Sequence, residues 1–227
     1  VEVELDPQEA VIAEPGSFMM MTDGVQMETL FGDGNQKGFM DKLFSAGKRL
    51  LTGENLFMTV YSNISTQKRQ VTFAAPYAGK IIPLNLAQLG GKIICQKDSF
   101  LCAAKGVAVG IEFQKKLVTG LFGGEGFIMQ KLEVDGMAFV HSGGHVIEKE
   151  LQAGDMLKID TGCIVAFTSS INYDIQFIGG VKNTLFGGEG VFYAVLKGPG
   201  KVWIQTLPIS RLAGRILSYG RGSRKEE

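Results

Sequence analysis

The 227-residue chain has little of several residue types, and each shortage argues against a class of protein. Its three cysteines are odd in number and lack Cys-x-x-Cys spacing, so neither a disulfide framework nor a cysteine metal site is expected. The 23 Lys and Arg residues balance the 23 Asp and Glu residues, which leaves no overall positive charge to favour nucleic-acid binding. No apolar run reaches the roughly 18 residues that a membrane span requires.

The cysteines Cys95, Cys102 and Cys163 lie in apolar runs. In such a setting cysteine behaves as a small buried hydrophobic residue, and reduced thiols persist in a reducing compartment. Residues 1–4 (VEVE) are too acidic for a signal or transit peptide. We therefore expect a cytoplasmic protein with buried, reduced cysteines and no transmembrane segment.

The chain contains an internal repeat. Residues 120–126 read GLFGGEG and residues 184–190 read TLFGGEG, 64 positions later. The same offset aligns Gly90 with Gly154 and Phe113 with Phe177 without a gap. The first third follows the pattern less closely and carries about 11 extra residues between Gly32 and Leu51. Because a repeat at fixed spacing indicates architecture more strongly than local signals do, we expect three similar units.

Apolar residues alternate within each unit, as in residues 201–206 (KVWIQT). A period of two is typical of half-buried strands. Glycine-containing turn signals at residues 143–144, 153–155, 179–180 and 198–200 interrupt these runs. The sequence therefore predicts an all-β fold of three pseudo-repeated antiparallel β-sandwich units.

Two stretches have helical periodicity instead. In residues 39–51 the apolar residues form one stripe with charged residues beside it, which predicts an amphipathic helix inserted in the first unit. Near the end of the chain, Pro208 stands at a first helical position and Gly220 is placed to end the helix. We expect one compact body over residues 1–206, with repeats at 1–76, 77–143 and 144–206, followed by a helix and tail at 207–227.

Several motifs together resemble a known family. They are the two LFGGEG segments, residues 52–57 (TGENLF), 74–77 (AAPY), 79–81 (GKI), 162–167 (GCIVAF) and 198–205 (GPGKVWIQ). Over about Leu5 to Leu207 the chain resembles the family named for altered inheritance of mitochondria. The resemblance implies a fold like that of the tryptophan RNA-binding attenuation protein, with three β-sandwich units per chain around a pseudo-threefold axis. It implies no activity and no catalytic residues, since the prokaryotic members are mostly uncharacterised and the fungal ones are linked to mitochondrial organisation.

A Gly-Glu pair recurs in every unit. The six residues are Gly53, Glu54, Gly124, Glu125, Gly188 and Glu189. Three equivalent carboxylates around an axis would bind a hard cation or a basic partner. The alternative, which we favour, is that each glycine forms a tight turn or bulge and each glutamate caps exposed turn amides. Repulsion between three bare carboxylates also opposes bringing them together.

His141 and His145 are the only histidines, and they flank Gly143 and Gly144. Two histidines four residues apart on a helix would align as metal ligands, but the two glycines predict a turn. The pair is therefore a weak metal alternative, and we predict no metal and no cofactor.

Other catalytic motifs are not supported. The GGEG segments continue as strand, whereas a phosphate-binding loop is followed by a helix. Ser17 and Ser99 lie outside any G-x-S-x-G context, and Cys163 takes the equivalent position in the third unit. A position that exchanges serine and cysteine suits a small, buried side chain.

RNA binding is suggested only by the expected likeness of fold to the attenuation protein, and likeness of fold does not transfer function. The aromatic and basic pairs that it would need are Tyr61 with Lys68 and Arg69, and Trp203 with Lys201. Both pairs fit ordinary strand faces, so nucleic acid is not expected as a partner.

The inserted helix offers a different surface. Its apolar stripe and basic flank would either cover the open end of the β-body or contact a partner or an acidic membrane. The candidate residues are Phe39, Met40, Leu43, Phe44, Lys48, Arg49 and Leu50.

We predict a non-enzymatic scaffold or interaction protein that self-associates through strand edges or the two helices, and a trimer is one such assembly. The first alternative is a metal- or small-molecule-binding β-sandwich enzyme that uses the repeated glutamates or the two histidines. The second is peripheral membrane association, or RNA binding by analogy of fold.

Overall fold

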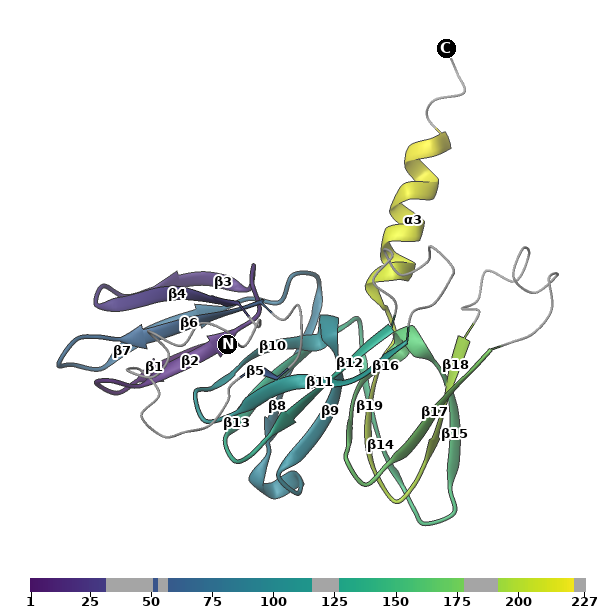
Figure 1. Ribbon diagram of the computed structural model, residues 1–227. Coiled ribbons are helices and arrows are strands. Elements are labelled where there is room, and N and C mark those ends of the chain that lie inside the picture. Colours follow the sequence, from purple (N-terminus) through teal and green to yellow (C-terminus); the bar gives the residue numbers. More distant parts are fainter. Residues whose placement is uncertain (32–50, 53–56, 116–126, 178–191, 223–227) are drawn as a thin grey trace. The chain divides into compact units, whose positions relative to one another are not determined.

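The computed structural model describes residues 1–31, 51–52, 57–115, 127–177 and 192–222. Strands make up most of these residues, and one α-helix, α3 (Ile209–Gly222), follows them (Figure 1). The predicted all-β class with a C-terminal helix is confirmed. The inserted helix falls on residues outside the described part, except that Leu51, its expected last residue, lies instead in strand β5 (Leu51–Thr52).

The strands follow one another at short intervals along the chain. The described strands before residue 77 are β1 (Glu2–Leu5), β2 (Ala10–Ala13), β3 (Phe18–Met21), β4 (Val25–Phe31), β5, β6 (Phe57–Asn63) and β7 (Arg69–Phe73). Residues 77–143 contain β8 (Gly79–Asn85), β9 (Lys92–Gln96), β10 (Phe100–Ala104), β11 (Ala108–Lys115), β12 (Phe127–Glu133) and β13 (Met137–Gly143), with short 3-10 helices η1 (Ala87–Leu89) and η2 (Lys97–Ser99). Residues 144–206 contain β14 (Val146–Leu151), β15 (Met156–Asp160), η4 (Thr161–Cys163), β16 (Ile164–Thr168), β17 (Asn172–Phe177), β18 (Phe192–Lys197) and β19 (Gly200–Gln205).

One strand order recurs in the three segments 1–76, 77–143 and 144–206. The first contains β1–β7–β3 and β4–β6–β2, the second β8–β13–β10 and β11–β12–β9, and the third β14–β19–β16 and β17–β18–β15. A register shift recurs as well, between Phe18 and Met20 in β3, between Phe100 and Cys102 in β10, and between Ile164 and Ala166 in β16. Superposition of the three segments, and likeness to the attenuation protein, stay predictions.

The described chain folds into two compact units. The described residues of one unit fall within 1–76, 81–114 and 128–141, and those of the other fall within 77–80, 115–127 and 142–222. The single body expected over residues 1–206 stays a prediction.

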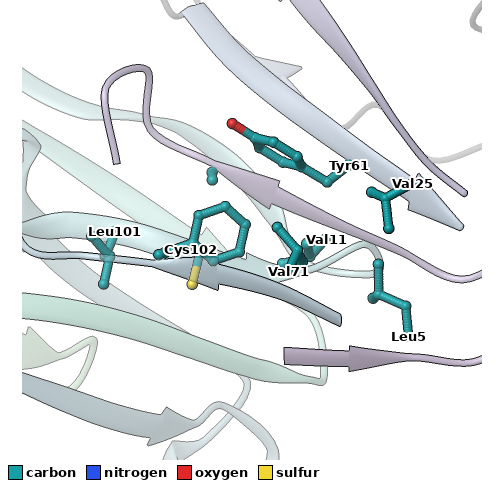
Figure 2. Packing of buried hydrophobic residues seen from close by; sticks show 9 residues of the cluster. Leu5, Val11, Val25, Tyr61, Val71, Leu101 and Cys102 are labelled. Atoms are coloured by element: carbon teal, nitrogen blue, oxygen red, sulfur yellow. The ribbon is translucent and has the colours of Figure 1, made fainter. Parts of the chain in front are cut away.

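Within the first unit, one junction joins two segments. Strand β2 pairs antiparallel with β10, with Ala13 opposite Cys102 and Val11 opposite Ala104. Leu101 and Cys102 consequently pack in the same buried cluster as residues of the first segment (Figure 2). The members from the first segment are Leu5, Val11, Ala13, Val25, Tyr61, Val71 and Phe73. The hydrophobic core is thus continuous across the strand pair that links the two segments.

One strand pair departs from the predicted antiparallel arrangement. Strand β5 runs parallel to β11, with Leu51 opposite Val109 and Thr52 opposite Gly110. These strands come from different segments and are not joined by a hairpin, so their direction is not constrained by a turn.

The predicted turns are found where they fall on described residues. Gly144 between β13 and β14, Gly154 between β14 and β15, and Gly200 at the start of β19 all have positive φ angles. This conformation is accessible to glycine at low cost. The turn expected at residues 179–180 lies outside the described residues.

Strand β19 is not half-buried, contrary to the alternation in its sequence. Val202, Trp203, Ile204 and Gln205 are all buried. Gln205 is accommodated because its amide group forms two hydrogen bonds to the main chain, one with Gly143 and one with Gly162.

Helix α3 follows β19 directly, and Pro208 immediately precedes it. The carbonyl of Pro208 accepts hydrogen bonds from the main-chain nitrogens of Arg211 and Leu212, which agrees with the predicted start. The predicted end at Gly220 was two residues short, since α3 continues to Gly222. The guanidinium of Arg211 pairs with Asp160 at 3.0 Å and fastens the first turn of the helix to the end of β15.

Candidate functional site

The residues predicted to be most informative lie outside the described part of the chain. These are the repeated pairs Gly53, Glu54, Gly124, Glu125, Gly188 and Glu189, and the helix residues Phe39, Met40, Leu43, Phe44, Lys48, Arg49 and Leu50. Their proposed roles in turns, cation binding or membrane contact stay predictions.

The two histidines differ in their surroundings. His141, in β13, is 1% exposed, and burial lowers the pKa of its ring, although a hydrogen bond with the main chain of Asp98 and the charge of Asp98 act in the opposite direction. His145 is exposed in the turn before β14. Across the described ranges, no group of three or more His, Cys, Asp or Glu side chains is placed to hold a metal ion.

The equivalent position that holds serine in the first two segments and cysteine in the third is buried, as predicted for a small side chain. Ser17 is 4% exposed, Ser99 is 1% exposed and Cys163 is 9% exposed. Cys95 and Cys102 are also buried, and none of the three cysteines forms a disulfide. Burial raises the pKa of the Cys102 thiol to about 12, which keeps it protonated and unreactive.

Neither aromatic residue considered for RNA stacking is accessible. Tyr61 is buried between Phe18, with which it stacks, and Phe73, which it meets edge-on. Trp203 is 4% exposed. A base cannot stack on a ring whose faces are covered, so both residues serve the core, as the strand-face interpretation predicts.

A partly buried acidic group, Glu14, was missed by sequence reasoning. Glu14 follows β2, and its main-chain nitrogen donates to the carbonyl of Leu101 at 3.0 Å. Burial raises the pKa of its carboxyl from 4.5 to about 7; the charge of Lys97 opposes this shift and that of Asp98 adds to it. The only signal in the sequence is a glutamate directly after a fully apolar strand.

A second buried polar residue lies in β12. Gln130 is fully buried and opposite Cys95 in the pairing of β12 with β9. Its amide nitrogen and oxygen have no hydrogen-bond partner among the described residues. An amide in that position is a candidate for contact with an internal water.

Strand β3 carries four consecutive exposed apolar residues. All four of its residues are exposed: Phe18 by 40%, Met19 by 60%, Met20 by 51% and Met21 by 39%. Among the described strands β3 pairs only with β7, so its other edge has no partner within the described part of the chain. An unpaired strand edge with exposed apolar side chains is a site where another chain can add a strand.

Strand β15 is the corresponding edge in the other unit. Among the described strands it pairs only with β18. Met156 is 56% exposed, and the ammonium group of Lys158 lies 5.5 Å from the centre of the Tyr193 ring. The edges of β3 and β15 therefore both carry exposed methionine side chains, which adapt to varied partner surfaces.

Comparison with known proteins places the chain in a family. The model of the family described as Mitochondrial biogenesis AIM24 matches residues 1–207. The chain belongs to the AIM24 family. The resemblance seen in the sequence motifs is thereby confirmed, and the matched region ends at Leu207, just before α3.

Relatives of this AIM24 protein are known from Streptococcus pyogenes. An uncharacterized protein of the serotype M6 strain is 30% identical over 223 residues, covering 96% of this chain and 86% of that protein. A crystal structure of another protein from this species superposes with a TM-score of 0.75 at 25% identity, covering 96% of this chain and 93% of that one. These relatives establish family and fold, and the function of this AIM24 protein is not established by them.

None of the described helices of the AIM24 protein has the length and apolar character to cross a membrane.

Proposed function

We propose that this protein is a non-enzymatic cytoplasmic scaffold that self-associates through strand edges, and that the edge of β3 is one of the contacting surfaces. The observation that carries the proposal is the exposure of Phe18–Met21, four large apolar residues in succession on an edge strand. Fully burying such a side chain from water contributes about 1.5–3 kcal/mol, and these four are already about half buried, so covering each of them supplies roughly half of that towards association.

The cysteines support the cytoplasmic part of the proposal. Cys95, Cys102 and Cys163 are buried and outside any disulfide. Burial raises the pKa of Cys95 and Cys102, so both remain thiols. A chain that uses cysteine only as a small apolar residue is suited to a reducing compartment.

Sedimentation velocity at micromolar concentration tests self-association. The proposal predicts a species heavier than the 24.5 kDa chain. Met20→Lys places a charge on the edge of β3 and should weaken association about tenfold or more, because each 1.4 kcal/mol corresponds to a factor of ten.

Met27→Lys is the matched control. Met27 lies in β4 and is 53% exposed, against 51% for Met20, but it is not on β3. It should leave the sedimentation profile unchanged. A strictly monomeric unsubstituted protein, or equal effects of the two substitutions, would contradict the proposal.

A further inference from the structure

The pairing of β2 with β10 gives the geometry by which one segment joins the next. Ala13 lies opposite Cys102, Ile12 opposite Ala103 and Val11 opposite Ala104. Main-chain hydrogen bonds close both ends of the pair, from Glu14 to Leu101 at 3.0 Å and from Lys105 to Ala10 at 3.2 Å. The second strand of one segment thus pairs with the third strand of the following one.

Strand β3 is the third strand of the first segment and has the local structure of β10. Each shows the same shift in register, after Phe18 in β3 and after Phe100 in β10, on pairing with the strand beside it. This shift aligns Met20 with Cys102 and Met21 with Ala103. No segment precedes the first one within the described chain, so β3 has no second strand to pair with.

Strand β15 is the second strand of the third segment and matches β2. The pairing of β15 with β18 begins at Met156, which lies opposite Lys197. The pairing of β2 with β6 begins in the same way at Ala10, which lies opposite Ser62. Ile159 therefore takes the place of Ala13. No segment follows the third one within the described chain.

The third strands of the first and second segments, β3 and β10, differ sharply in burial. Strand β10 lies between β2 and β13, and its residues 100–103 are buried. Strand β3 has β7 on one side only, and its four residues are exposed. A second neighbour would give β3 the lateral strand pairing that β10 has with β2.

We propose that β15 of one copy pairs antiparallel with β3 of a second copy, with Met20 opposite Ile159, Met21 opposite Lys158 and Thr22 opposite Leu157. This inference rests on the self-association proposed above and names its partner strand and register. The ligand of the β3 edge is thus a second copy of this chain.

The register places compatible groups together. By analogy with the β2–β10 pair, the main-chain nitrogen of Asp160 would donate to Met19 and that of Asp23 to Met156. Lys158 would lie diagonally across from Asp23 on one face, within reach of an ion pair. Met20 would lie on the same face as Ile159 and Leu157.

The contact is heterologous, because β3 of one copy meets β15 of another. After one such contact, the first copy still has its β15 edge available and the second copy still has its β3 edge available. Such contacts continue until a ring closes or a filament grows. Either product has a mass that is a multiple of the single chain.

Disulfide trapping between two singly substituted chains tests the register. Opposed residues in an antiparallel pair have Cα atoms about 4.5–5.5 Å apart, within the range that a disulfide spans. Met20→Cys and Ile159→Cys chains, mixed and treated with a mild thiol oxidant, should give a crosslinked dimer that neither chain gives alone. Because each chain carries one substitution, an intrachain bond between the two positions is excluded.

Met156→Cys mixed with Met20→Cys is the control, since it lies three residues along β15, about 10 Å away. It should crosslink at least tenfold less. Thr22→Cys with Leu157→Cys is a second pair for the same register, used if Ile159→Cys melts at a lower temperature than the unsubstituted protein.

The outcomes separate the two proposals. Oligomers in the sedimentation profile without either crosslink would overturn the register and leave self-association standing. A monomer that forms an intrachain bond when Met20→Cys and Ile159→Cys are combined in one chain would overturn both. Equal crosslinking of the control pair would overturn the register as well.

Discussion

The amide nitrogen of Gln205 donates a hydrogen bond to the main-chain oxygen of Gly162 at 2.8 Å. Sixty-four residues earlier, the ring of His141 forms a hydrogen bond with the main chain of Asp98. In both segments a buried side chain at the end of the last strand thus holds the short 3-10 helix that precedes the third strand. The internal repeat therefore preserves a structural contact even where the residue changes.

Replacing Gln205 with leucine should destabilise the second unit. The substitution removes the bonds to Gly162 and Gly143 and leaves buried main-chain groups without partners. Each such group costs roughly 1–3 kcal/mol, so the free energy of unfolding should fall by about 2 kcal/mol or more in urea denaturation. Gln152→Leu, at an exposed turn, should change it by under about 0.5 kcal/mol.

His141→Gln should be tolerated, because glutamine makes the equivalent contact in the third segment. Since burial lowers the pKa of His141 below 6.5, the unfolded chain binds a proton more readily than the folded chain. The histidine therefore contributes stability above pH 6.5 that is lost as pH falls. Thermal melts should show that His141→Gln removes part of this acid sensitivity, whereas His141→Leu lowers the melting temperature at neutral pH.

Glu14 should change stability with pH in the direction opposite to His141. Its folded-state pKa of about 7 exceeds the ordinary value of 4.5, so folding takes up a proton between these pH values. The stabilisation is present below pH 4.5 and is lost as pH rises to 7. The free energy of unfolding of Glu14→Gln, relative to that of the unsubstituted protein, should therefore rise by roughly 2 kcal/mol as the pH increases from 5 to 7.5. Urea unfolding at several pH values measures this difference. A constant difference across this range would show that Glu14 is not desolvated.

Two glycine substitutions separate steric from conformational effects. A Cβ atom at Gly143 would overlap the main-chain oxygen of Leu207, so Gly143→Ala requires the backbone to move. Gly154 has a φ of +92° but nothing within 4 Å of its Cβ position, so Gly154→Ala costs only conformational strain, about 1 kcal/mol. Differential scanning calorimetry should show a much larger loss of melting temperature for Gly143→Ala; equal losses would contradict the steric account.

Patterns within the sequence predicted the fold class and the family. The 64-residue offset correctly identified Ser99 and Cys163 as equivalent buried positions, because such sites accept only small side chains. Glycines marked the turns at Gly144 and Gly154, where φ is positive. Both features can be read from the sequence without knowledge of the long-range strand pairing.

The candidate site was predicted only as unspecified strand edges. The run of Phe18–Met21 resembles any core strand, and its exposure depends on which other elements pack against it, which residues 18–21 do not encode. Gln205 looked like a solvent-facing residue of an alternating strand, but partners 43 and 62 residues away keep it buried. Long-range pairing decides both cases.

The most direct test of the account is amide hydrogen exchange in β3 as a function of protein concentration. If β15 of a second copy covers β3, the amides of Met21 and Asp23, which alternate with the Thr22 amide already bonded to Gln70, should become protected as concentration rises. Met20→Lys should abolish this protection, and Met27→Lys should preserve it. Rapid exchange of these amides at every concentration, equal in all three proteins, would contradict the claim that this edge is the self-association site.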